Sequence, residues 1–137
     1  MKNTVAVLAM TFALMSSIVA GAQTPLMKVQ IPFQFTAGET TFPAGQYTIK
    51  AMGNGEKVLS IRNEKSPVAN MVMTDSAQHL EASSRTKLVF HRYGDNYFLA
   101  EAWIAGDKIG RAVPVRAREE GYAKEFTRDE VVVAVKR

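Results

Sequence analysis

The stretch at residues 87–103, KLVFHRYGDNYFLAEAW, decides the predicted fold of this chain. Two runs rich in apolar and aromatic residues flank a turn at residues 93–97, YGDNY. Such a pattern is typical of a β-hairpin, because Gly, Asp and Asn accept the backbone angles of a tight turn between strands. We therefore expect antiparallel strands to form the framework of the fold.

The register of this hairpin is left open by the sequence. With a two-residue loop at 94–95, His91 lies opposite Phe98. With a three-residue loop that also includes Asn96, His91 lies opposite Leu99. The choice matters because a slip of one residue changes which side chains share a face of the sheet.

The rest of the chain predicts more strands of the same kind. Pro32 lies inside the first apolar-polar alternation and lacks an N–H, so that strand is expected at an edge or with a bulge. Two segments differ: residues 75–85 are polar and predict a long loop, and residues 114–126 have apolar residues three to four apart, which predicts a helix. Strands are predicted at residues 27–35, 46–52, 57–62, 68–74, 108–113 and 131–135.

These elements together predict a mainly all-β fold. Short strands separated by Gly, Pro and Asn turns favour a small antiparallel meander of about six to eight strands, closed as a barrel or stacked as a sandwich, with one C-terminal helix.

The first residues have the pattern of a secretory signal peptide. Lys2 precedes an uncharged run at residues 4–20, and small residues follow up to Ala22. The run is shorter than the roughly 20 residues that span a membrane, so cleavage is favoured over a transmembrane anchor. We expect residues 1–22 to be removed and residues 23–137 to form a single domain, periplasmic or extracellular, with no stable membrane anchor.

Composition argues against several classes of function. The chain has no Cys, which excludes disulfides, thiolate metal sites and a cysteine nucleophile. The formal net charge of +4 is mild, so nucleic acid is not an expected partner. His79 and His91 are the two histidines, and neither has the spacing of a metal ligand set. No metal, cofactor, serine-hydrolase motif or phosphate loop is predicted.

The candidate binding residues lie on the central hairpin. Aromatic faces and a few charges there could form a platform for a small molecule, a glycan or an envelope protein, although cross-strand aromatic pairs also stabilise sheets without binding anything. The candidate ligand-binding residues are His91, Arg92, Tyr93, Asp95, Tyr97 and Trp103.

The leading interpretation is an exported, non-enzymatic β domain that binds a ligand or serves as a structural component of the envelope. One alternative is a small periplasmic hydrolase or isomerase in which His91 acts with Asp95 or Glu101; it requires these groups to converge in a pocket. A purely structural subunit would instead show an exposed apolar patch or an open sheet edge.

Two segments resemble small exported bacterial proteins of unknown function. They are IPFQFTAG at residues 31–38, followed by FPAGQY at 42–47, and LVFHRYGDNYFL at 88–99. The likeness extends over most of residues 23–137. It implies export and an all-β fold, and it implies no activity, ligand or catalytic residue.

Overall fold

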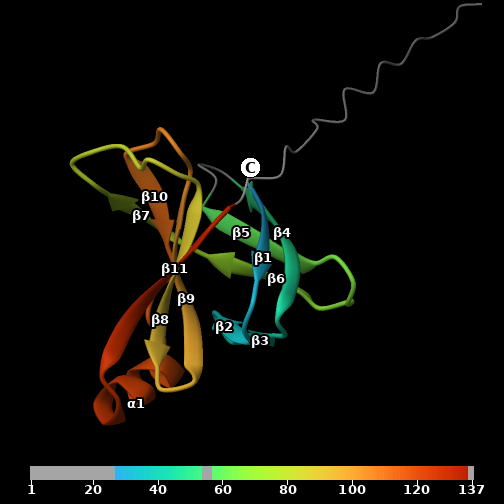
Figure 1. Cartoon of the computed structure of the whole chain (residues 1–137), viewed down its shortest axis with the longest axis vertical. Coiled ribbons are helices and arrows are strands. Elements are labelled where there is room, and N and C mark those ends of the chain that lie inside the picture. Colours follow the sequence, from blue (N-terminus) through green and yellow to red (C-terminus); the bar gives the residue numbers. More distant parts are fainter. Residues whose placement is uncertain (1–26, 54–56, 136–137) are drawn as a thin grey trace, which may run out of the picture.

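The computed structural model describes residues 27–53 and 57–135, which form eleven strands and one helix (Figure 1). One sheet has the strand order β1 (Met27–Ile31), β4 (Gly45–Met52), β5 (Val58–Asn63), β6 (Ala69–Met73). The other has the order β11 (Arg128–Ala134), β8 (Lys87–Tyr93), β9 (Asn96–Trp103), β10 (Ile109–Ala112), β7 (Asp75–Gln78). Two further strands, β2 (Phe35–Ala37) and β3 (Thr40–Phe42), pair with each other, and β2 joins β9.

The all-β prediction is confirmed, with the two sheets packed as a sandwich on one core. All strand pairings are antiparallel except a single parallel bridge between Thr36 and Phe98. The structure has more strands than the six to eight expected. The additional ones are the short strands β2, β3 and β7, for which the sequence predicted no separate strand. Alternate side chains of the strands in both sheets point inward and form one core. Its members include Val29, Ile31, Phe35, Ile49, Leu59, Ile61, Leu88, Phe90 and Leu99.

The prediction of one strand at residues 27–35 is wrong, because the chain changes sheets at Pro32. β1 ends at Ile31 in the first sheet, and β2 begins at Phe35 in the second. The crossing is fixed by Phe33, whose ring stacks on Tyr97 with centroids 3.8 Å apart and meets Phe90 edge-on at 4.9 Å. Because proline has no backbone N–H to donate to a neighbouring strand, Pro32 lies just after the last paired residue of β1.

The prediction of a loop over residues 75–85 is wrong at its start. Residues 75–78 form β7, which pairs with β10 so that Ala77 lies opposite Gly110. β7 is an edge strand with mostly exposed side chains, and so it lacks the apolar alternation by which a strand is recognised.

The central hairpin is confirmed and takes the two-residue loop. His91 lies opposite Phe98, and Gly94 has the positive φ of +62° that a tight turn needs. The ladder shifts register between Val89 and Phe90, which leaves Ala100 as an extra residue in β9. This β-bulge changes the twist along the hairpin.

The helix is shorter than predicted and buries a different residue. α1 (Ala117–Glu125) begins three residues after Pro114, with Arg116 at its N-cap. Its one buried residue is Glu119, whereas Phe126, predicted on its apolar side, is 45% exposed. β11 follows, and it begins at Arg128, earlier than the predicted strand because its first residues are polar. α1 lies at the hairpin end of the second sheet (Figure 1).

The predicted signal peptide, residues 1–22, lies outside the described residues. Within residues 27–53 and 57–135, no helix has the length and hydropathy to cross a membrane.

Candidate functional site

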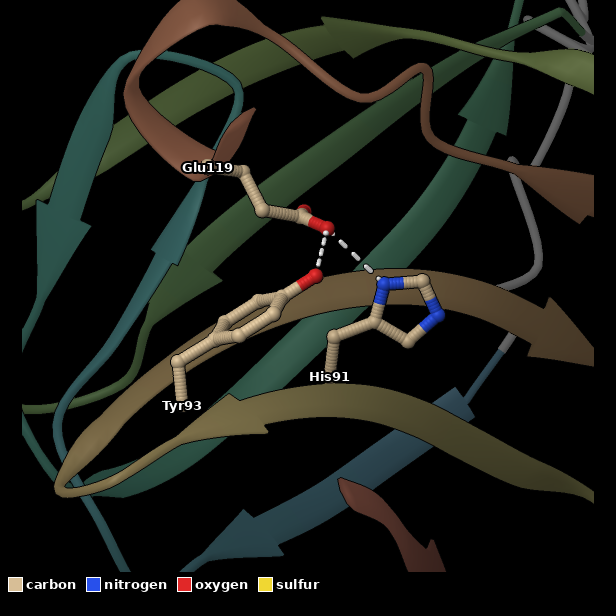
Figure 2. A network of polar contacts seen from close by, with 3 residues as sticks. All are labelled: His91, Tyr93 and Glu119. Carbon is tan, nitrogen blue, oxygen red and sulfur yellow. Dashed lines mark hydrogen bonds and ion pairs between the residues drawn. The ribbon is translucent and has the colours of Figure 1, made fainter. Parts of the chain in front are cut away.

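A buried carboxylate joins the helix to the central hairpin. The hydroxyl of Tyr93 donates a hydrogen bond of 2.9 Å to Oε2 of Glu119, and Nδ1 of His91 lies 2.9 Å from the same oxygen (Figure 2). Glu119 is 6% exposed and Tyr93 is 1% exposed. An ionisable group this deep is stable only when hydrogen-bonded, and these two donors supply that need.

Strand and helix geometry explain how the three side chains meet. His91 and Tyr93 are two apart on β8, so both point to the sheet face that α1 covers. Glu119 is the third residue of α1, where the helix dipole favours a negative charge. Burial, and then the hydrogen bond to Glu119, raise the pKa of Tyr93 above its ordinary value, so the hydroxyl stays protonated.

This cluster has little room for a substrate. The cavity that Glu119 lines has a volume of about 10 Å³, which is the space of about one water molecule. A general base acts on a proton within hydrogen-bond reach in a pocket that admits the reactant. The geometry therefore favours a role in holding α1 on the sheet.

The structure separates the remaining predicted residues. Arg92 points to the opposite sheet face from His91, and its guanidinium donates to Asp129 at 3.0 Å; that hydrogen bond raises the pKa of Arg92. Trp103 is buried at the far end of β9, where its Nε1 donates to Glu101 at 2.8 Å and its ring contacts that of His79 at a tilt of 35°. Glu101 is thus paired with Trp103 and not with His91.

The other two predicted residues line a small cleft at the tip of the hairpin. Asp95 and Tyr97 meet α1 and the β2–β3 segment around a cleft of about 230 Å³. Nη1 of Arg118 donates to the hydroxyl of Thr41 at 3.4 Å across it. This tip cleft is defined by six of its lining residues: Gln34, Thr41, Asp95, Tyr97, Arg118 and Tyr122.

Sequence reasoning missed the partners that the helix contributes. Glu119 stands in AREEGYAKE among other acidic residues, and no spacing distinguishes it from Glu120. Arg118 and Tyr122 are four residues apart, which places them on one face of a helix, but nothing in the sequence aims them at the hairpin tip. Of the described residues, no three His, Asp or Glu side chains gather where they could hold a metal ion.

Comparisons of the chain with protein-family models, with curated proteins and with solved structures gave no significant match.

Proposed function

We propose that this chain is an exported, non-enzymatic binding domain whose tip cleft binds one sugar unit of a glycan. The observation behind this proposal is the chemistry of the tip cleft, where polar and aromatic side chains from three separate segments converge. Export is proposed on the signal-peptide pattern at residues 1–22.

The tip cleft offers the groups that sugar hydroxyls need. Arg118 donates from a planar guanidinium, the Asp95 carboxylate accepts, and Gln34 can do both. The rings of Tyr97 and Tyr122 add apolar faces with polar tips. The volume of about 230 Å³ is below the roughly 300–1,000 Å³ of pockets that enclose drug-sized ligands, which fits a single sugar unit better than an oligosaccharide.

The positions of the acid-base candidates favour binding over catalysis. A hydrolase or isomerase using His91 requires Asp95 or Glu101 beside it, yet His91 contacts Glu119 and Glu101 contacts Trp103. Asp95, in the exposed turn, is the one of the three that reaches the tip cleft. A lone carboxylate there can orient a hydroxyl without a second group to complete a proton transfer.

The test is a titration with glucose, N-acetylglucosamine and glucuronate, followed through the backbone amide NMR signals of residues 94–98. The variant Arg118→Met removes a cleft donor, and Lys124→Met is its matched control, because Lys124 lies on the same helix and is exposed away from the cleft. A hydrogen bond to a charged group contributes about 1.5–3 kcal/mol, so Arg118→Met should weaken binding about tenfold or more.

Binding of at least one sugar that is weakened by Arg118→Met and unchanged by Lys124→Met supports the proposal. If none of the three sugars shifts these signals at millimolar concentration, or if both variants behave alike, the tip cleft is not a sugar site.

A further inference from the structure

The outer face of the four-stranded sheet is a second feature that the tip cleft leaves unused. β1, β4, β5 and β6 turn alternate side chains into the core and the others outward. A shallow groove of about 530 Å³ runs over the outward side chains of these strands. In Figure 1 this sheet lies apart from α1, which packs on the other sheet. The groove is thus distinct from the tip cleft.

Three cations occupy one part of this face. Lys28 on β1 and Arg62 on β5 both lie opposite Thr48 on the central strand β4, and Lys50 follows two residues further along β4. Neighbouring strands are about 4.8 Å apart, so the three positions form a triangle with sides of roughly 8–10 Å. Thr48 lies between Lys28 and Arg62, Ser60 lies opposite Lys50 on β5, and both line the same groove.

The face carries more positive than negative charge. No outward-facing residue of the four strands is acidic, and no described carboxylate is within ion-pair distance of Lys28, Lys50 or Arg62. Glu64, just beyond β5, accepts a hydrogen bond of 3.3 Å from Thr48, so one carboxylate reaches this face, and three cations against one carboxylate leave it positive. The charge therefore complements an anionic partner.

An apolar margin borders the cationic triangle. On the edge strand β6, Met71 is 61% exposed and Met73 is 59% exposed. Across the sheet, Met73 lies opposite Val58, which lies opposite Met52. Methionine is flexible and unbranched, and so it can adapt to a disordered apolar surface. Cations on one side and methionines on the other make the face amphipathic.

We propose that this sheet face docks on a bilayer of anionic phospholipid. Lys28, Lys50 and Arg62 contact lipid phosphates, and Met71 and Met73 enter between the headgroups. The described part of the face has no aromatic ring on which a sugar could stack, and three cations are few for a nucleic acid, whose binding grows with every phosphate neutralised. A lipid surface uses both the charge and the exposed methionines.

The expected affinity follows from the number of cations. Each Lys or Arg near an anionic membrane contributes about fivefold to binding, so the cationic triangle contributes on the order of a hundredfold. Such binding is reversible and falls with salt.

The experiment is cosedimentation of the protein with vesicles of phosphatidylglycerol and phosphatidylcholine in equal parts, against vesicles of phosphatidylcholine alone. The triple variant Lys28→Gln/Lys50→Gln/Arg62→Gln removes the cationic triangle. Its matched control, Arg85→Gln/Lys108→Gln/Lys124→Gln, has the same net charge and alters exposed residues elsewhere. A second variant, Met71→Ser/Met73→Ser, tests the apolar margin and changes no charge.

We expect binding to the mixed vesicles only, reduced on the order of a hundredfold by the first triple variant and less than tenfold by its control. The methionine variant should bind several-fold more weakly but with the same dependence on salt, because its cations are unchanged. Equal losses in the two triple variants would show diffuse charge attraction and overturn the proposal. So would equal binding to both vesicles, or binding to polyglucuronate with no binding to vesicles. Circular dichroism of each variant verifies that it is folded.

Discussion

Replacing Glu119 by Ala should destabilise the protein far more than replacing its neighbour Glu120. Glu119 is buried and accepts hydrogen bonds from β8, whereas Glu120 is exposed in the same helical turn. Both substitutions lose a favourable charge near the helix N-terminus, worth about 0.3–1 kcal/mol, and both gain the helix propensity of Ala. The difference between the two variants therefore isolates the buried contacts.

The magnitude follows from the two donors that lose their acceptor. The hydroxyl of Tyr93 is fully buried, and a buried donor left unpaired costs about 1–3 kcal/mol. The side chain of His91 is 18% exposed and can turn to water, so its loss is smaller, about 0.5–1 kcal/mol. We expect Glu119→Ala to lower the free energy of unfolding by about 2–4 kcal/mol and Glu120→Ala by less than about 1 kcal/mol.

The assay is urea unfolding followed by the fluorescence of Trp103, the only tryptophan and a buried one. A second substitution, Tyr93→Phe, completes a double-mutant cycle with Glu119→Ala. In the otherwise unchanged protein, Tyr93→Phe should lower the free energy of unfolding. In the Glu119→Ala variant it should raise that free energy by about 1 kcal/mol, because no buried hydroxyl is then left without an acceptor. If Glu119→Ala and Glu120→Ala agree within about 0.5 kcal/mol, the buried cluster does not hold the helix and the reasoning fails.

Three further measurements probe other parts of the fold. Gly110→Ala should cost about 1–3 kcal/mol in the same unfolding assay, because its Cβ would lie 2.7 Å from the ring of Trp103; an unchanged midpoint would contradict this. Burial raises the pKa of both Tyr47 and Tyr93 in the folded protein. The folded state therefore keeps the full stabilisation from these tyrosines below a pH of about 10, the pKa of tyrosine in the unfolded chain. Above that pH the free energy of unfolding should fall by about 1.4 kcal/mol per pH unit for each tyrosine, until the pH reaches the raised pKa. Unfolding midpoints at alkaline pH, compared with tyrosinate absorbance, test that slope, and a flat profile would refute it. Arg92→Ala should leave the urea midpoint nearly unchanged, because its ion pair with Asp129 is exposed; a clear drop in the midpoint would contradict this.

The local pattern of the chain was enough to predict most of its strands. The hairpin at residues 87–103 was recognisable because its apolar residues and its turn both lie within one short segment. β7 was not, because an edge strand with exposed side chains such as Ser76 and Gln78 has no apolar alternation. Pro32 signalled an interruption, but whether the chain bulged or changed sheets depended on where Phe33 could pack.

The candidate site was harder to predict than the fold, because it is made by contacts distant in sequence. His91 and Tyr93 were recognised as reactive side chains, yet their partner Glu119 lies 28 and 26 residues away on a helix of uncertain register. Six hairpin residues were treated as one patch, whereas alternation along the strands separates Arg92 from His91, and the length of β9 separates Trp103 from the turn. Of the six, Asp95 and Tyr97 line the tip cleft, whose other lining residues come from α1 and from the segment around β2 and β3.

The crossing at Pro32 means that the second sheet takes strands from both halves of the chain. The chain enters the first sheet with β1, places β2 and β3 against the second, returns for β4 to β6, and only then builds the remainder of the second sheet. A single cut between Met73 and Asp75 would therefore give two fragments, neither of which encloses the core alone. Phe35 in one fragment packs on Phe90 in the other. We expect such fragments to remain associated and to reassemble when mixed, which gel filtration of the nicked protein would show by co-elution and would refute by their separation.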